Sequence, residues 1–134
     1  SPNSVTDVDG RYLGMDLKVH TTDMKHPVYT IFSLWDTFRA LHPLLTIVDP
    51  QLNTEFIRSL IKKHQEGGIF PKWDCVSNYT GTMVGNSPRQ GDKRNKAVLE
   101  QSSRWLAQEP LRMDWYRLYA RILCPVCYKL GTMA

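Results

Sequence analysis

The most constraining feature of the sequence is an amphipathic segment that carries its own start and stop signals. Apolar positions recur every three or four residues at Leu52, Phe56, Ile57, Leu60, Ile61 and His64. Asp49-Pro50 precedes them and is typical of a helix start, because the carboxylate accepts from unpaired amides and proline suits the first turn. Gly67-Gly68 follows, and glycine readily adopts the positive φ that ends a helix. The pattern predicts a helix over residues 50–66.

A second apolar stripe predicts a helical region over residues 31–48. Its members share the same spacing and are Ile31, Leu34, Trp35, Phe38, Leu41 and Leu45. Proline lacks the N–H that a helix interior needs, so we expect Pro43 to interrupt this region. The helix should run from about Ser33 to Leu41, and a short turn through Thr46 should follow.

The remaining part of the N-terminal half is predicted to be extended. Strand-favouring residues such as Tyr12 and Val19 follow the tight-turn dipeptide Asp9-Gly10, which indicates a short β hairpin. Residues 69–73 should also be extended because Pro71 opposes a helix, and a loop should begin at Ser77.

Residues 86–134 differ from the rest of the chain. A polar, turn-rich stretch opens this part, and helices are predicted over residues 96–108 and 113–123. It holds nine lysine and arginine residues against four acidic ones, so the excess behind the net charge of +4 lies here. These basic residues are scattered and not clustered with aromatic ones, so we expect no binding to nucleic acid.

Composition points to an ordinary globular protein. With 134 residues, 42% of them hydrophobic, the chain has enough apolar residues for one small core. It has no run approaching the roughly 18–20 apolar residues that span a bilayer, so we expect no membrane partner. Residues 1–4 lack the charged head and apolar segment of a signal peptide.

The three cysteines leave several roles open. Cys124 and Cys127 form a Cys-Pro-Val-Cys pair, whereas Cys75 stands alone. A zinc site needs four ligands, and no pair of histidines has a matching spacing. Zinc binding and a redox dithiol therefore stay open beside the favoured interpretation, which is ordinary thiols.

Tryptophans beside charged residues suggest a surface for sugars. Trp35, Asp36 and Arg39 lie at the front of the first predicted helix, and Trp73 and Asp74 follow the second. Aromatic faces pack on the C–H face of a sugar ring, and planar polar groups bind its hydroxyls. A plainer alternative also fits these residues, with Asp36 paired to Arg39 along the helix and Trp35 in the core.

Five strings of sequence carry a family resemblance. They are Asp7-Val-Asp-Gly-Arg-Tyr-Leu-Gly-Met-Asp16, Tyr29-Thr-Ile-Phe-Ser-Leu-Trp-Asp-Thr-Phe-Arg-Ala40, His42-Pro-Leu-Leu-Thr-Ile-Val48, Phe70-Pro-Lys-Trp73 and Asn78-Tyr-Thr-Gly-Thr-Met-Val-Gly85. In this order and spacing, residues 6–85 resemble glycoside hydrolase family 92. The resemblance implies a β-sandwich and a catalytic (α/α)6 barrel in the complete protein. Residues 1–85 would then be a mainly α, partial barrel segment with a short N-terminal β hairpin, and residues 86–134 an unassigned basic helical tail.

The same resemblance implies calcium-dependent, inverting, exo-acting hydrolysis of α-mannosides from N-glycans or mannans, in a secreted or periplasmic protein. Inversion needs one carboxylic acid and one carboxylate base, and the base is expected further along the chain than any residue that we can align. Most positions expected to bind calcium are absent too, so we assign no metal ligand. The chain should then be an inactive fragment. Its partners would be the rest of the barrel, the β-sandwich domain and α-mannoside glycans, and its uncovered apolar faces favour self-association.

The implied sugar site has two walls. Trp35, Asp36 and Arg39 should line the pocket for the terminal mannose, and Trp73 should lie opposite them. The other members of the second wall are Asn78 and Thr80.

Tyr79 departs from the family pattern. Many members have Asn-Glu-Thr where this chain has Asn78-Tyr79-Thr80, and the resemblance implies that this glutamate is the general acid. A phenol gives up its proton less readily than a carboxyl group. An altered substrate or leaving group, an acid from elsewhere and the loss of hydrolysis all remain open. Glu66 and Asp74 are candidate replacements, although Glu66 at a helix end is expected to be a solvated charge.

Two alternatives to a mannosidase fragment follow. The chain would be a non-catalytic mannoside-binding fragment if Tyr79 removes hydrolysis. It would be a small helical interaction protein if the basic tail binds a partner or a metal. Residues 86–134 themselves are open to interpretation as a divergent insert, a product of frameshift or altered splicing, or an incomplete gene prediction.

Overall fold

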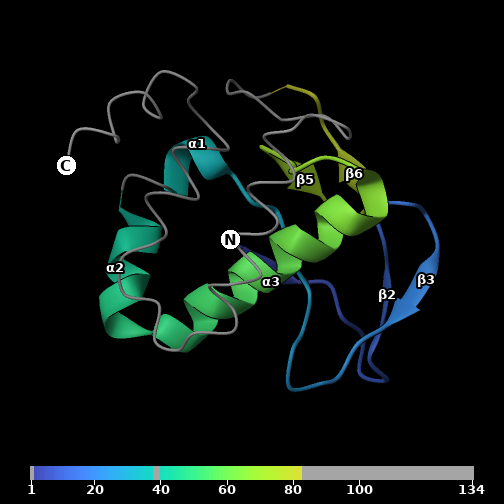
Figure 1. Ribbon diagram of the computed structural model, residues 1–134, viewed down its shortest axis with the longest axis horizontal. Helices are drawn as coiled ribbons and strands as arrows, with labels where there is room; N and C mark the ends of the chain where they lie inside the picture. The colour runs from blue at the N-terminus through green and yellow to red at the C-terminus, as the bar shows by residue number, and fades with distance from the viewer. Residues whose placement is uncertain (1, 38–39, 83–134) are drawn as a thin grey trace.

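The computed structural model describes residues 2–37 and 40–82, which form three helices and three two-stranded sheets. The helices are α1 (Leu34–Thr37), α2 (Leu41–Val48) and α3 (Pro50–Gly67). The strands are β1 (Asn3–Ser4), β2 (Arg11–Leu13), β3 (Val19–Thr21), β4 (Tyr29–Thr30), β5 (Asp74–Cys75) and β6 (Asn78–Tyr79). Helix α3 crosses the molecule, with α2 at its N-terminal end and β5–β6 near its C-terminal end (Figure 1).

Helix α3 confirms the strongest prediction from sequence. Asp49 caps it, with its Oδ1 accepting from the backbone N–H of Leu52 at 3.0 Å, and Pro50 occupies the first turn. Gly68 ends the helix with φ 74°. The predicted stripe is buried apart from Leu52, which is half-buried. Helix α3 also buries polar residues that periodicity alone does not predict, among them Lys63.

The prediction for Pro43 is wrong. Pro43 lies inside the first turn of α2, where the N–H that proline lacks has no partner within a helix. The predicted continuous helix to Leu41 does not form either, because Ala40 lies in a turn and α2 begins at Leu41. Local periodicity thus located the helical region but misplaced the break within it.

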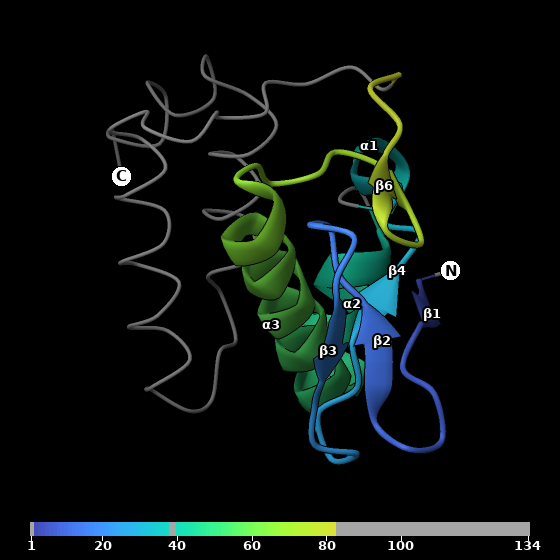
Figure 2. The same cartoon turned by 90° about the vertical axis from the view of Figure 1, so that its right-hand side faces the viewer.

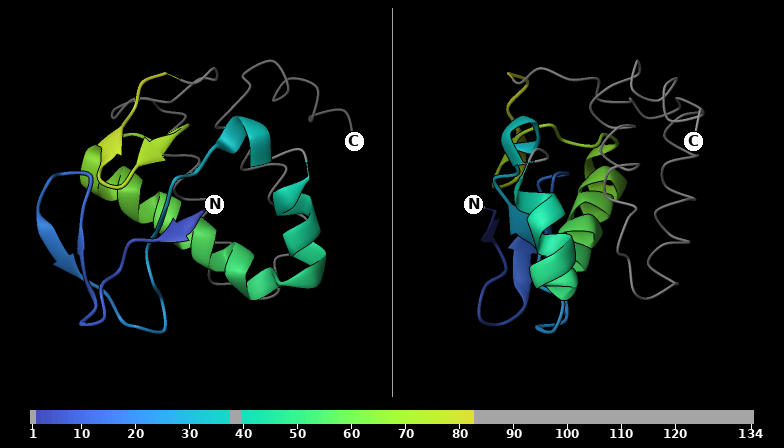
Figure 3. Two further views of the ribbon diagram at one scale, coloured as in Figure 1. Left: turned by 180° about the vertical axis from the view of Figure 1, so that it is seen from behind. Right: turned by 90° about the vertical axis from the view of Figure 1, so that its left-hand side faces the viewer.

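The strand pairs extend the predicted hairpin. Strands β2 and β3 pair antiparallel, with Tyr12 opposite His20, as expected after the Asp9-Gly10 turn. Strand β1 pairs with β4, and β5 pairs with β6 where a loop was predicted to begin. Figure 2 shows β1 to β4 on one side of α3, and Figure 3 shows α2 and the hairpin β2–β3 toward opposite ends of that helix.

The core of the described region lies between α3 and the segments leading into α1 and β5. Its fully buried apolar side chains include Phe32, Leu34, Ile57, Leu60 and Phe70. Phe56 contacts Tyr29 and Phe32 edge to face, with ring centroids 4.9 and 5.6 Å apart. These aromatic contacts fix β4 and the start of α1 against α3.

Other predictions concern residues that the structure leaves undescribed or tests only in part. The helices predicted over residues 96–108 and 113–123, and the Cys124–Cys127 pair, lie outside the described residues. Cys75 is an exposed free thiol. None of the helices within residues 2–37 and 40–82 combines the length and apolarity needed to cross a bilayer.

Candidate functional site

The structure brings the two predicted walls of the sugar site together at one end of the molecule. Ser33 and Trp73 form an isolated antiparallel bridge, and the N–H of Leu34 donates to the carbonyl of Lys72 at 3.1 Å. The start of α1 therefore lies directly beside the strand entering β5. Figures 1 and 2 show α1 and β5–β6 adjacent at this end in both views.

The first wall is built on the opening turn of α1. The Ser33 hydroxyl donates to the carboxylate of Asp36, and the Ser33 carbonyl accepts from the backbone N–H of Asp36 at 3.0 Å. Asp36 is exposed, so its carboxylate is accessible to solvent beside the helix start. Trp35 is 37% exposed and does not lie in a closed apolar core, against the plainer interpretation of this tryptophan. Arg39, the third predicted member, lies outside the described residues.

The second wall is the hairpin β5–β6. The carbonyl of Trp73 accepts from both the N–H and the hydroxyl of Thr80, at 3.3 and 2.9 Å. Asp74 pairs with Tyr79 across the hairpin. Trp73, Tyr79 and Thr80 are half-buried, and Asn78 is exposed. Trp73 thus connects both walls through backbone contacts with Ser33 on one side and Thr80 on the other.

Asp74 lies beneath this surface and is paired with a buried lysine. Its carboxylate is fully buried and lies 2.8 Å from Nζ of Lys63, which is 3% exposed. It also accepts from the hydroxyl of Thr30 at 2.6 Å and from the N–H of Phe32 at 3.1 Å. A buried carboxylate with these partners fixes β4, α3 and β5 relative to one another.

Two residues with unusual backbone conformations flank this network. Ile31 and Val76 have φ of 60° and 56°, which is rare for β-branched residues and costs on the order of 1–3 kcal/mol each. Ile31 lies between Thr30 and Phe32, both bound to Asp74. The carbonyl of Val76 lies within 3.1 Å of the Thr30 hydroxyl. The network therefore holds the chain in a path that its residues do not favour.

Sequence reasoning missed Lys63 as the partner of Asp74. A usable signal exists, because Lys63 follows Phe56 and Leu60 at helical spacing and so shares their buried face. A lysine at such a position needs a buried acidic partner, since an unpaired ammonium is costly to bury. Asp74 is the nearby carboxylate that supplies it.

Glu66 does not have the solvated role that its place at the helix end suggested. Its Oε1 accepts from the Tyr12 hydroxyl at 2.6 Å, and its Oε2 accepts from the N–H of Met15 at 3.0 Å. Burial, and then the bond to Glu66, raise the pKa of Tyr12. Glu66 therefore anchors the hairpin β2–β3 to the end of α3.

The described residues show no cluster of the side chains that most often bind metals. No three histidine, cysteine or acidic side chains within residues 2–37 and 40–82 are grouped so as to hold a metal ion. Calcium takes six to eight oxygen ligands, usually with several carboxylates. Asp36 is an accessible carboxylate on this surface and would supply one such ligand.

Comparison with known proteins gives a family profile and two solved structures. Residues 1–90 match the profile described as the glycosyl hydrolase family 92 catalytic domain. One similar structure is a family 92 alpha-mannosidase from Bacteroides thetaiotaomicron, with 23% identity and a TM-score of 0.60 over 87% of this chain and 17% of that chain. Another is a structure of the same alpha-mannosidase in complex with mannoimidazole, with 24% identity and a TM-score of 0.60 over 96% of this chain and 17% of that chain. No curated protein matches the sequence. The chain thus spans a small part of the structures that it resembles, and the likeness to them is one of fold.

Proposed function

The chain belongs to glycosyl hydrolase family 92. We propose that it is a segment of an α-mannosidase. We also propose that its end lined by Trp35 and Trp73 contributes to binding a terminal α-mannoside. The observation that carries this proposal is the bridge between Ser33 and Trp73, which joins two parts of the chain far apart in sequence. Trp35 and Trp73 offer aromatic surface, and Asp36 offers an accessible carboxylate for hydroxyl groups. Arg39, Asn78 and Thr80 complete the proposed set.

We propose that the fold is a partial (α/α)6 barrel. The apolar side chains of Leu44, Ile47 and Val48 are largely exposed on α2, as expected for a face meant to pack against further helices. The complete protein would add those helices and a β-sandwich domain, act outside the cytoplasm and use calcium. It would remove terminal mannose from N-glycans or mannans with inversion, which requires a carboxylate base that the family resemblance places further along the sequence.

Tyr79 favours a second candidate function, in which the site binds mannosides without cleaving them. Its phenol stands where the family resemblance implies a general acid, and its neighbour Asp74 is committed to the buried network with Lys63. A phenol still donates and accepts hydrogen bonds, so Tyr79 suits binding better than proton transfer.

The 134-residue chain is expected to bind methyl α-mannoside weakly and to leave nitrophenyl α-mannoside uncleaved, with or without added calcium. Titration followed by tryptophan fluorescence measures binding. Trp35→Ala and Trp73→Ala should each weaken it by roughly 3- to 10-fold, the equivalent of one aromatic contact. Val8→Ala, at an exposed apolar residue on a distant loop, is the matched control. Equal affinity of the parent and the three variants for methyl α-mannoside would contradict the proposed site. Cleavage of nitrophenyl α-mannoside that Asp36→Ala abolishes would contradict the expectation that the fragment is inactive.

The uncovered face of α2 is expected to make the isolated chain self-associate as its concentration rises. Sedimentation velocity should show species larger than a monomer in the parent. Ile47→Glu should shift the distribution toward monomer, because a charge on the apolar face opposes its burial. Val19→Glu, at an exposed residue of the hairpin, should leave the distribution unchanged. A parent that stays monomeric would contradict the expectation.

A further inference from the structure

A concave surface lies away from the tryptophan-lined end. A cleft of about 540 Å³ opens between the loop after β3 and the N-terminal half of α3. This volume falls within the range of about 300–1,000 Å³ that is common for small-molecule sites. None of the described residues proposed above for binding mannose lines this cleft.

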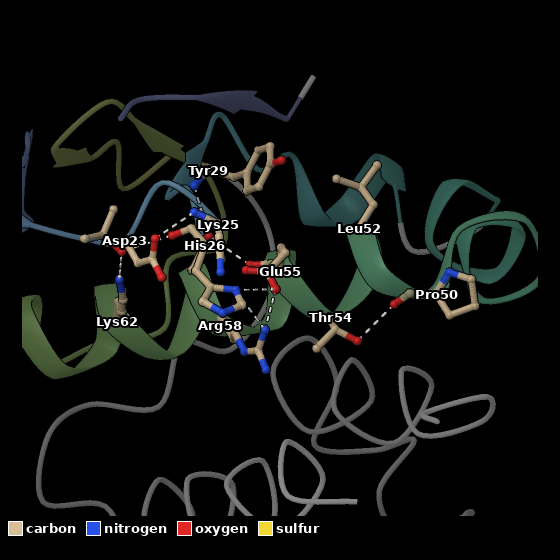
Figure 4. A network of polar contacts seen from close by, with 12 residues as sticks. Asp23, Lys25, His26, Tyr29, Pro50, Leu52, Thr54, Glu55, Arg58 and Lys62 are labelled. Carbon is tan, nitrogen blue, oxygen red and sulfur yellow. Dashed lines mark hydrogen bonds and ion pairs between the residues drawn. The ribbon is translucent and has the colours of Figure 1, made fainter. Parts of the chain in front are cut away.

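The polar wall of the cleft is organised around Glu55. Its Oε1 lies 3.0 Å from Nδ1 of His26 and also binds Nη1 of Arg58. Figure 4 shows the side chains of His26, Glu55 and Arg58 converging. The guanidinium group has five N–H donors in a planar fork, so its pairing with Glu55 fixes its orientation and leaves further donors for a ligand.

The loop that carries His26 is itself held in place. The N–H of His26 donates to the carbonyl of Asp23 at 2.8 Å, and its carbonyl accepts from the Thr22 hydroxyl at 3.0 Å. Lys62 of α3 donates to that hydroxyl at 2.6 Å. Both polar partners of Glu55, His26 and Arg58, therefore lie in segments that are already held in place. Less conformational entropy is then lost when a ligand binds.

Another part of the cleft wall is aromatic and apolar. Tyr29 contacts Phe56 edge to face and is fixed to α3, because its backbone N–H donates to the Ser59 hydroxyl at 2.9 Å. Leu52 and Pro27 line the cleft beside it. This wall suits the C–H face of a ring.

The charges of the cleft define the class of ligand. Among the described lining residues, the lysine and arginine cations Lys25 and Arg58 are matched by the carboxylate anions Asp49 and Glu55. The two carboxylates would repel an anionic ligand, and the ammonium and guanidinium groups would repel a cationic one. A neutral ligand rich in hydroxyls can donate to one set and accept from the other.

We propose that this cleft is a second sugar site that binds one neutral hexopyranoside, with Arg58 and Lys25 as donors and Tyr29 against the ring. Its assignment to a sugar rests on the proposed function, whereas its position and residues do not. A second site would let the protein hold another unit of a glycan apart from the terminal mannose.

The test is a titration of the full 134-residue chain with methyl α-mannoside, followed by amide and indole NMR signals. Saturating shifts are expected for the amides of residues 25–29 and 51–58. Arg58→Met should weaken this binding by about 10-fold or more, as expected for the loss of a hydrogen bond from a charged donor. Lys25→Met, on an exposed loop where folding is not at risk, should weaken it by a few-fold. Arg11→Met, which breaks an exposed pair with Asp9, is the matched control.

The two sites give separable outcomes. Trp35→Ala should leave the amide shifts at the cleft unchanged, because Trp35 does not line it. Shifts confined to the indoles and residues 73–80 would overturn the second site and leave the proposed function standing. Saturating shifts at the cleft with inorganic phosphate in place of the sugar would overturn the assignment to a neutral ligand. Cleft amide signals that do not shift on addition of methyl α-mannoside would overturn the second site, whatever the indole signals show. The indole signals test the proposed function independently.

Discussion

Asp74→Ala is expected to lower the free energy of unfolding by about 3–5 kcal/mol, as is typical when one partner of a buried ion pair is removed. The variant leaves Nζ of Lys63 buried, with only a 3.4 Å contact to the Val76 carbonyl. It also removes the acceptor for the Thr30 hydroxyl and the Phe32 N–H. Urea denaturation at neutral pH measures the loss.

Two variants test whether the pair causes this loss. The double variant Lys63→Met with Asp74→Leu should recover much of it, because apolar side chains of similar volume remove both buried charges together. Asp9→Ala breaks the exposed pair with Arg11 and should leave the unfolding free energy nearly unchanged. An Asp74→Ala variant as stable as Asp9→Ala would show that the buried pair contributes little.

Local signals explain which elements could be predicted from the sequence. Helix α3 is capped by Asp49 and Gly68, and each cap acts on the backbone within one turn of the helix end. The limits of α3 could therefore be predicted from the sequence. The hairpin β2–β3 was predicted from strand-favouring residues such as Tyr12 and Val19, but the Asp9-Gly10 turn precedes β2, and residues 14–18 connect the two strands. Pro43 was misread because proline has different consequences in the first turn and in the interior of a helix, and the start of α2 had no clear capping residue.

The candidate site could be predicted only where residue type or the family resemblance singled out its residues. Trp35, Asp36 and Trp73 stand out by type, and family resemblance supplied their order. The buried network could not be read in this way, because Thr30 and Asp74 are separated by 44 positions and meet only when β4 and β5 are placed against α3. The cleft has the same origin, since His26 and Glu55 lie 29 positions apart. Such constellations depend on tertiary packing, so helical spacing can mark Lys63 as buried but does not identify its partner.

A second large effect is expected from pH, through His42. This side chain is fully buried, and burial lowers its pKa from 6.5 to about 4, although Asn53 partly offsets the shift. His42 therefore binds a proton below about pH 6.5 in the unfolded chain, but only below about pH 4 in the folded chain. Stability should be unaffected above pH 6.5 and fall by about 3 kcal/mol between pH 6.5 and 4, at about 1.4 kcal/mol per pKa unit. Burial also lowers the pKa of His64, which acts in the same direction.

His42→Gln separates this effect from the protonation of carboxylates. Glutamine keeps a polar group near the Thr37 hydroxyl, which lies 2.9 Å from Nε2 of His42, but it has no proton to gain. Urea denaturation between pH 6.5 and 5 should give a flatter profile for this variant, in a range where ordinary carboxyl groups stay ionised. The lowered pKa of Asp16, which follows chiefly from its bond to His20, places its contribution at still lower pH. A His42→Gln profile as steep as that of the parent would assign the acid sensitivity to other groups, with His64 the first to examine by the same substitution.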